Sequence, residues 1–412
     1  MLIRRSIITQ IDFWIDREEI IFLAGARQTG KTTLLKYYRD EIAKKELSVR
    51  YYNFENPSDV LLASDYDVFL KKALSKHGKT YIFIDEVQLH PHPSNFLKYL
   101  FDEYRNQIKL MVTGSVNFEL KSRMQDSLVG RKITFEIMPF NFSEFLLAKE
   151  YETKIYPVDD VDQMDQLLEE YMIYGGLPSI VLARDSETKR RLLSEYVRTY
   201  IGKDARSLIL DESITSFNKM LIILARETGN LKNDQNVCQY SAQSLYQVKK
   251  GLDVLQYTYI CRYLYPYYEN PIARIRKTQK VYFHDTGVRN AILEDFRPMP
   301  DRTDSGALFE NVVLNEIRAK TTTEHLYYLR SSSGNEVDFV VHDEFGNRYF
   351  IEAKYRRISR SPKYLKGLAY LRQKANPTCT YVVNRSLEHM TDGIEYISFS
   401  RFVRDVHISE LK

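Results

Sequence analysis

The sequence Ile20-Ile-Phe-Leu-Ala-Gly-Ala-Arg-Gln-Thr-Gly-Lys-Thr32 decides the fold of the first part of the chain. Its first five residues are apolar and predict a buried strand, and the next eight match the pattern G-x-x-x-x-G-K-[ST]. The two glycines let the backbone curl so that its amide groups point at phosphate oxygens. The helical pattern that starts at Lys31 adds the positive end of a helix dipole. The stretch therefore predicts a phosphate-binding loop between a strand and a helix.

Individual positions of this loop carry the chemistry. We expect the Lys31 ammonium to reach the outer phosphates and the Thr32 hydroxyl to ligate Mg²⁺. A turn of the same composition that binds no ligand is the structural alternative. The predicted nucleotide-binding residues are Gly25, Ala26, Arg27, Gln28, Thr29, Gly30, Lys31, Thr32 and Thr33.

An acidic pair follows a second apolar run. Residues 81–86 read Tyr-Ile-Phe-Ile-Asp-Glu, so Asp85 and Glu86 come at the end of a predicted buried strand. We predict that Asp85 holds Mg²⁺ directly or through water, and that Glu86 orients and deprotonates the attacking water. A solvated acidic turn is the structural alternative.

A third apolar run, residues 110–115, ends in small polar side chains where a sensor of the γ-phosphate would lie. Thr113, Ser115 or Asn117 could serve, because only a short hydroxyl or amide fits between the acids and the phosphate. We name Ser115 as the candidate, so that Lys31, Glu86 and Ser115 form the predicted catalytic set.

Two arginines are candidates for contacting phosphate, either in cis or across a subunit interface. Arg27 lies inside the loop, and Arg131 follows Leu128-Val-Gly130. For each, a plain surface arginine is the alternative. An arginine that reaches a neighbour's phosphate would make the protein a homo-oligomer, although the sequence does not fix the oligomeric state.

The pattern along the chain predicts an α/β protein with several parts. The first 150 residues alternate short apolar runs with helical patterns, which is typical of a parallel sheet flanked by helices. A helical stretch follows. Short helices and aromatic strand-like runs then resemble a winged helix, with residues 244–255 as its recognition helix. The predicted domains are 1–155, the phosphate-loop core; 156–228, a helical segment; 229–295, the winged-helix module; and 305–412, a small α/β domain.

A second set of charged residues lies near the end of the chain. Glu310 falls on a predicted helix, Asp338 on a predicted strand, and Glu352 and Lys354 on one face of the next strand. Two carboxylates and an ammonium that converge suit a phosphodiesterase, in which the acids hold one or two Mg²⁺ or Mn²⁺ ions and the lysine assists a nucleophilic water. A degenerate fold that only grips DNA and a plain packing domain are the alternatives.

These residues resemble the AAA+ superfamily, and in particular prokaryotic ATPases that join such a core to an uncharacterised C-terminal domain. The C-terminal set resembles the PD-(D/E)xK restriction-endonuclease fold, with Val337-Asp338 where the family name expects Pro-Asp. The resemblance implies an ATPase core, a lid, a winged helix and a nuclease-like tail, and the choice of ATP over GTP rests on it alone. Its further landmarks are Tyr52-Asn-Phe-Glu55, Ile84-Asp-Glu-Val-Gln88, Thr113-Gly-Ser115, Met138-Pro-Phe140, Glu144-Phe145, Tyr174-Gly-Gly-Leu-Pro178 and Lys280-Val-Tyr-Phe-His-Asp285.

Composition says more about the cellular location of the protein than about its function. The chain has 59 basic and 55 acidic residues in 412, so any basic surface that binds DNA must be local, as at Lys249 and Lys250. Its three cysteines are too few and too scattered for a disulfide framework. No apolar run is long enough for a membrane span, and the N-terminus does not read as a signal peptide. We therefore expect a cytoplasmic protein with no membrane partner.

The leading hypothesis is a Mg²⁺-dependent ATPase that couples its nucleotide state to DNA binding, with DNA cleavage by the C-terminal domain as a further activity. The alternative is a nucleotide-gated switch for protein assembly, with slow ATP hydrolysis and a catalytically inactive tail. A small-molecule kinase that uses the same loop is a third reading, which the long tail and the Asp-Glu pair argue against.

Overall fold

The computed structural model describes residues 3–76, 78–114, 128–150, 161–205, 208, 214–268, 270, 272, 274, 277–321, 325–356 and 366–406. These residues form two compact units. The N-terminal unit contains residues 1–139 and 257–259, and the C-terminal unit contains residues 140–256 and 260–412.

A parallel sheet forms the centre of the N-terminal unit. Its strands are β1 (Ile20–Ala24), β2 (Ser48–Asn53), β3 (Thr80–Asp85), β4 (Ile108–Gly114) and β5 (Lys132–Glu136). They run in the order β2-β3-β4-β1-β5, and every neighbouring pair is parallel. The predicted parallel sheet is therefore confirmed. Because β4 lies between β3 and β1 and all three are parallel, their carboxyl ends lie at the same edge of the sheet, where the phosphate loop and the acidic pair begin.

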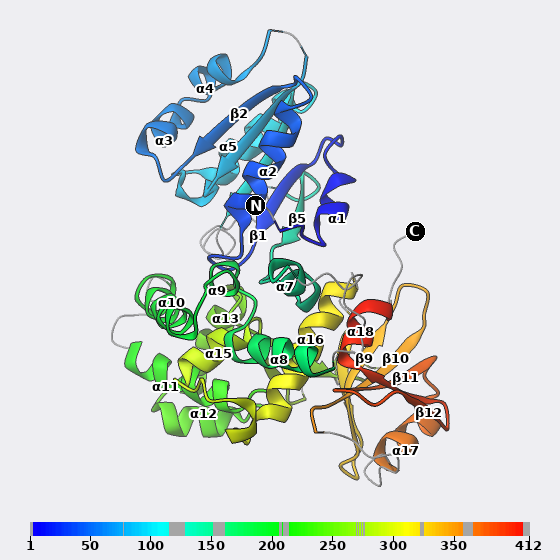
Figure 1. Ribbon diagram of the computed structural model, residues 1–412. Helices are drawn as coiled ribbons and strands as arrows, with labels where there is room; N and C mark the ends of the chain where they lie inside the picture. The colour runs from blue at the N-terminus through cyan, green and yellow to red at the C-terminus, as the bar shows by residue number, and fades with distance from the viewer. Residues whose placement is uncertain are drawn as a thin grey trace. The chain divides into compact units, whose positions relative to one another are not determined.

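Helices cover both faces of this sheet (Figure 1). Side chains alternate along β1, so Ile21 and Leu23 pack on one face while Ile20 and Phe22 pack on the other. The first face is covered by α1 (Ile8–Asp12) and α2 (Lys31–Ala43). The second is covered by α3 (Pro57–Ser64), α4 (Tyr66–Ala73) and α5 (Pro93–Tyr104), and a 3₁₀ turn, η1 (Val87–Leu89), follows β3.

The C-terminal unit begins as a set of helices around an apolar core. That core is lined by Leu193, Phe217, Leu224, Leu252 and Phe283, all of them buried. The helices are α7 (Phe142–Ala148), α8 (Val161–Tyr174), α9 (Pro178–Val181), α10 (Ser186–Thr199) with the π-helical turn η2 (Tyr200–Ala205), α11 (Ile214–Arg226), α12 (Asp234–Ser241), α13 (Leu245–Tyr257) and α15 (Thr286–Ile292).

A mixed sheet completes this unit. Its order is β12-β13-β11-β10-β9-β8-β6-β7. The strands are β6 (Cys261–Pro266), β7 (Lys280–Phe283), β8 (Leu326–Arg330), β9 (Glu336–His342), β10 (Arg348–Lys354), β11 (Cys379–Asn384), β12 (His389–Thr391) and β13 (Ile394–Ser398). The remaining elements are η4 (Met299–Asp301), α16 (Ser305–Lys320), α17 (Lys366–Ala375) and α18 (Phe399–Asp405).

Two parts that the sequence predicts as separate modules share this sheet. The hairpin β6–β7 belongs to residues 229–295, yet β6 pairs with β8 at Tyr265 and Tyr327. Residues 305 onward form a helix, three strands, a helix and a strand, namely α16, β8, β9, β10, α17 and β11. Side chains from β7 can therefore reach the face that carries the predicted nuclease-like residues. No helix among the described residues is long and apolar enough to span a bilayer.

Candidate functional site

The predicted phosphate loop connects β1 to α2. Gly25 has a φ of 150°, and a Cβ at this position would lie 2.4 Å from the Ile137 carbonyl oxygen. Only glycine therefore fits where the loop leaves the strand. The loop ends at Gly30, and α2 starts at Lys31 with the N–H groups of its first turn directed toward the loop. The first turn of α2 therefore directly follows a tight glycine-containing loop.

Lys31 lies inside the curve of this loop. Its side chain is buried, and the ammonium donates to the carbonyl oxygens of Gly25 at 3.1 Å and Ala26 at 2.7 Å. These contacts hold the ammonium within the curve of the loop. Arg27, Gln28 and Thr33 are exposed around the loop.

A contact that the sequence does not reveal braces the loop from outside. The Arg5 guanidinium donates to the carbonyl oxygens of Thr29 at 3.0 Å and Met138 at 2.6 Å. The Thr29 hydroxyl in turn donates to the Ala26 carbonyl oxygen at 3.0 Å. Nothing in the local pattern around Arg5 indicates this role, because its partners lie 24 and 133 residues away.

Asp85 lies at the carboxyl end of β3, buried, and accepts hydrogen bonds from three hydroxyl groups. Thr32 donates to its Oδ1 at 3.1 Å, Tyr51 donates to its Oδ2 at 3.2 Å, and Thr113 donates to Oδ1. Burial, together with the neighbouring Asp85 carboxylate, raises the pKa of the Tyr51 phenol well above its usual range, so Tyr51 remains a donor. The structure thus brings Thr32 and Asp85 together, as their predicted shared role requires. Tyr51 is a partner that the sequence analysis missed.

Glu86 follows directly, in a left-handed backbone conformation with φ of 54°. Its backbone N–H donates to the Thr113 hydroxyl at 2.9 Å, and the Gln88 amide donates to its carboxylate. Thr113 therefore contacts both members of the acidic pair. Of the three candidate sensors, Thr113 lies in the described part of the chain, whereas Ser115 and Asn117 lie outside the described residues.

Arg131 forms a two-point ion pair in the structure. Its guanidinium donates to both carboxylate oxygens of Asp102, at 2.6 and 3.1 Å. This pairing is partly exposed and gives the arginine a structural partner within its own unit. A contact between Arg131 and phosphate remains a prediction.

The C-terminal unit brings the second predicted set together. The Lys354 ammonium lies 2.5 Å from Glu352 Oε1 and 3.9 Å from Asp338 Oδ2. The backbone N–H of Asp338 donates to Glu352 at 3.2 Å, and the N–H of Ala353 donates to Asp338 at 2.9 Å. Neighbouring strands β9 and β10 therefore hold Asp338, Glu352 and Lys354 in one place.

Glu310 reaches the same cluster from α16 through residues that the sequence analysis did not assign to it. The Lys280 ammonium lies 3.1 Å from Glu310, 2.6 Å from Glu336 and 3.9 Å from Asp338. The Tyr282 hydroxyl also donates to Glu310. Alternation along β7 places Lys280 and Tyr282 on one face, and this was the available signal in the landmark Lys280-Val-Tyr-Phe-His-Asp285.

Glu310, Glu336, Asp338 and Glu352 together form what we call the carboxylate cluster. Burial and the neighbouring charges shift pKa values in and around this cluster. Loss of solvent, together with repulsion from Asp338, raises the pKa of both Glu310 and Glu352. Burial opposes the charge on Lys280, yet attraction from Glu310, Asp338 and Glu336 outweighs it and raises the pKa of the ammonium. Attraction from Asp338 and Glu352 likewise outweighs burial and raises the pKa of Lys354.

The cluster does not fit a metal ion as it is arranged. Among the described residues, no group of three or more His, Cys, Asp and Glu side chains could hold one. The carboxylates face ammonium groups instead, because Lys280 contacts three of them and Lys354 contacts two.

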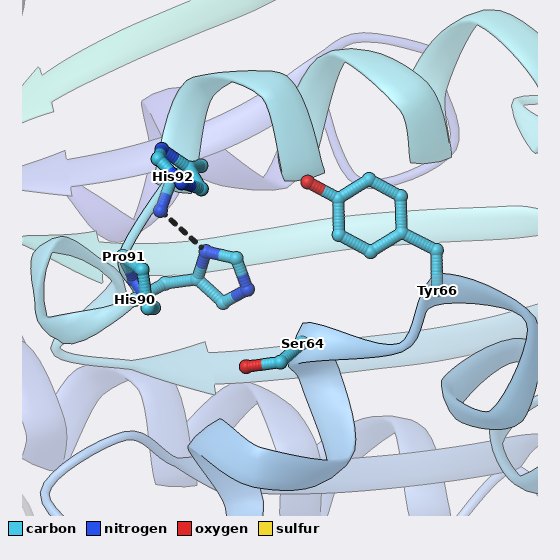
Figure 2. Close-up of a pocket in the computed structure, with 5 residues that line it drawn as sticks. All are labelled: Ser64, Tyr66, His90, Pro91 and His92. Carbon is cyan, nitrogen blue, oxygen red and sulfur yellow. Dashed lines mark hydrogen bonds between the residues drawn. The ribbon is translucent and has the colours of Figure 1, made fainter.

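A small hollow lies elsewhere in the N-terminal unit (Figure 2). It encloses about 230 Å³ and is lined by Ser64, Tyr66, His90, Pro91 and His92. The backbone N–H of His92 donates to His90 Nδ1 at 3.0 Å, and His90 Nε2 lies 3.2 Å from the Ala63 carbonyl oxygen. Burial lowers the pKa of His90. Both ring nitrogens of His90 have polar partners in the neighbouring backbone, so this histidine forms a fixed part of the wall of the hollow.

Comparison with known families divides the chain into three segments. Residues 17–146 match the family described as "AAA domain". Residues 165–298 and residues 305–402 each match a family described as a domain of unknown function, DUF8612 and DUF4143 respectively. The first segment therefore carries an AAA domain, which confirms that part of the predicted resemblance. The winged-helix and nuclease-like assignments stay predictions.

Relatives that match over most of their length occur in archaea and bacteria. An uncharacterized protein of Methanocaldococcus jannaschii is 27% identical over 378 residues, which cover 85% of this chain and 79% of that protein. An uncharacterized protein of Mycobacterium tuberculosis is 26% identical over 354 residues, covering 85% and 74% of the two chains.

Two solved structures show a distant likeness. One is the Aeropyrum pernix Orc1 protein in complex with DNA, at 15% identity and a TM-score of 0.30, covering 67% of this chain and 87% of that chain. The other is Cdc6p from Pyrobaculum aerophilum, at 14% identity and a TM-score of 0.32, covering 71% and 93%. Both TM-scores are far below 0.5, so the function proposed below rests on the side chains of the two sites.

Proposed function

We propose that this protein is a Mg²⁺-dependent ATPase that couples its nucleotide state to DNA binding. The observation that carries the proposal is the meeting of Lys31, Thr32 and Asp85 at one edge of the AAA domain's sheet. A backbone loop, an ammonium, a hydroxyl and a carboxylate are the groups that a binding site for a nucleoside triphosphate and its cation requires.

Each residue has a defined part in this chemistry. Lys31 neutralises the outer phosphates, and Thr32 and Asp85 would hold Mg²⁺, which when bound neutralises charge on the β- and γ-phosphates. Glu86 accepts a proton from the attacking water, and Gln88 keeps its carboxylate oriented. Thr113 positions Asp85 and Glu86 relative to each other, since its hydroxyl contacts both.

The test of this part is calorimetric titration of the full chain with ATP and Mg²⁺. We expect heat of binding for the wild type and none for Lys31→Ala, because the variant lacks the ammonium inside the loop. Lys36→Ala is the matched control, since Lys36 lies on the exposed side of the same helix. GTP in place of ATP tests the choice of base. A wild type that binds no purine nucleotide would overturn the proposal.

DNA binding is proposed for α12 and α13, which are followed by the β6–β7 hairpin in the order expected for a winged helix. The first half of α13 is exposed, and Tyr246 has 77% of its surface accessible. Lys249 and Lys250 are exposed one turn further on. An amphipathic aromatic side chain beside two ammonium groups suits a phosphate backbone and the bases next to it.

Salt dependence tests this surface. We expect the double variant Lys249→Ala/Lys250→Ala to weaken DNA binding and to lower the slope of log K against log salt by about 1–2. Lys44→Ala/Lys45→Ala changes the charge equally at an exposed helix end in the N-terminal unit and should bind as the wild type does. No binding of the wild type at low salt would remove DNA from the proposal.

DNA cleavage is the second candidate function, favoured by the approach of Asp338, Glu352 and Lys354. It requires a divalent ion to displace the ammonium groups that face these carboxylates in the structure. Plasmid and branched DNA are incubated with Mg²⁺ or Mn²⁺ and the wild type, Asp338→Ala or Lys354→Ala. Cleavage by the wild type alone would assign a nuclease. DNA binding without cleavage by any of the three would favour the switch with an inactive tail.

A further inference from the structure

Lys280 is a buried charge of the C-terminal unit that the proposed function leaves without a role. Its side chain is 3% exposed, and its ammonium contacts Glu310, Glu336 and Asp338. These carboxylates come from α16 and β9, so one ammonium joins two elements. Such a group is neither a solvated surface charge nor a pair with a single partner.

The backbone fixes Lys280 at this place. It stands opposite Leu264 in the β6–β7 ladder, and a bridge joins it to Leu231 on its other side. The Tyr328 ring lies 5.6 Å from the ammonium. With strand pairing on both sides, the short β7 cannot turn Lys280 away from the cluster without losing backbone hydrogen bonds.

Asp338 lies between two ammonium groups. Lys280 is 3.9 Å from its Oδ1, and Lys354 is 3.9 Å from its Oδ2. A divalent cation bound to Asp338 would lie close to both ammonium groups in a region of reduced dielectric, where repulsion between like charges is strong. Lys354 belongs to the proposed nuclease-like motif, whereas Lys280 comes from outside it.

We propose that Lys280 is the resident cation of the carboxylate cluster and excludes divalent metal ions from Glu310 and Asp338. This inference rests on the proposed nuclease-like character of the cluster, and it identifies Lys280 as the positive charge that neutralises the carboxylates. The lysine supplies positive charge that a metal would otherwise supply, at a high effective concentration because it is part of the same chain. The cluster therefore binds a divalent ion only when the ammonium is removed or displaced.

The test is a titration of the full chain with Mn²⁺ in the absence of nucleotide. The electron paramagnetic resonance signal of free Mn²⁺ measures how much of the ion is bound. We expect wild type and Asp338→Asn to bind Mn²⁺ equally weakly, because Lys280 closes the site in the wild type. We expect Lys280→Met to bind Mn²⁺ at least about tenfold more tightly than the wild type does, because methionine keeps the volume of the side chain and removes its charge. The gain should vanish in Lys280→Met/Asp338→Asn and be absent from Lys280→Arg, which keeps the charge.

Lys232→Met is the matched control. Lys232 has a similar exposure of 8% but pairs with a single carboxylate, Asp234, outside the cluster. It should bind Mn²⁺ as the wild type does.

Two results would overturn the inference. One is a Lys280→Met protein, folded by circular dichroism, that gains no affinity for Mn²⁺. The other is tight Mn²⁺ binding by the wild type that Asp338→Asn abolishes, and this result does not depend on any Lys280 variant folding. ATP binding is measured separately on the same preparations, so failure of the ATPase proposal and failure of this one are distinguishable.

Discussion

The Thr32 hydroxyl donates a 3.1 Å hydrogen bond to the Asp85 carboxylate across 53 residues of sequence. This bond joins the start of α2 to the end of β3, so the two proposed Mg²⁺ ligands already face each other. We expect Asp85→Asn to weaken ATP binding in Mg²⁺ while leaving binding in EDTA close to that of the wild type. Calorimetry in the two buffers measures the difference. Equal loss in both buffers would mean that Asp85 only supports the loop.

Glu86 is predicted to act in hydrolysis and not in binding. Glu86→Gln keeps the shape of the side chain and its contact with Gln88, but it cannot accept a proton. We expect ATP affinity to remain and the turnover rate to fall on the order of 100-fold or more. Phosphate release measures turnover, and titration measures affinity. Normal turnover by this variant would remove Glu86 from its assigned role.

Thr113 connects the acidic pair to β4, and its loss should be visible in stability. Thr113→Val deletes the bond to Asp85 and leaves the Glu86 N–H without its acceptor in a partly buried place. We expect the free energy of unfolding to fall by about 1–3 kcal/mol, with a lower rate of ATP hydrolysis. Thr113→Ser keeps the hydroxyl and should restore both. Urea unfolding is the measurement, and equal stability of the two variants would contradict the prediction.

Gly176 is a position of close backbone approach in the C-terminal unit. A Cβ there would lie 2.1 Å from the Phe140 carbonyl oxygen, and the Phe140 N–H donates to the Gly176 carbonyl oxygen at 2.7 Å. We expect Gly176→Ala to lower the free energy of unfolding by about 3 kcal/mol. Gly306→Ala is the control, because nothing lies near its Cβ position and a helical alanine is favoured by up to about 1 kcal/mol.

Glu316 should make stability depend on pH. Burial raises its pKa from 4.5 to about 7, although it accepts the Phe142 N–H, and Lys320 and Glu144 also act on it. The folded state therefore binds more protons than the unfolded state between these values. The stability that Glu316 contributes is complete below about pH 4.5 and is lost as pH rises through 7.

Glu316→Gln removes this titration and keeps an oxygen acceptor for Phe142. We expect the variant to gain stability relative to the wild type as pH rises from 5 to 8, by at most on the order of 3 kcal/mol. Urea unfolding at several pH values checks this. Parallel pH profiles for the two proteins would show that Glu316 does not titrate in this range.

The sequence was sufficient for features encoded within a short stretch. The pattern from Gly25 to Thr32 specifies the loop, and a carboxylate after an apolar run places Asp85 at the sheet edge. The prediction that Asp338, Glu352 and Lys354 converge depended on only two neighbouring strands, and the structure does bring them together.

Contacts between distant elements could not be predicted in this way. Arg5 braces the loop, and Tyr51 reaches Asp85 from β2, because the fold brings their strands and turns together. Lys280 is the clearest case, since its role depends on β6 joining the C-terminal sheet at β8. The sequence pattern places such residues on a strand face, but it does not say which other element that face will meet.

The strand β7 has only four residues, and a buried charged residue lies at its start and another just beyond its end. Lys280 begins it within the carboxylate cluster, and Asp285 follows it two residues beyond its end. The Asp285 carboxylate accepts the N–H of Gly176 at 2.7 Å and the N–H of Val288 at 2.9 Å. One short run of backbone therefore links the ammonium in the carboxylate cluster to the hydrogen bond that holds Gly176.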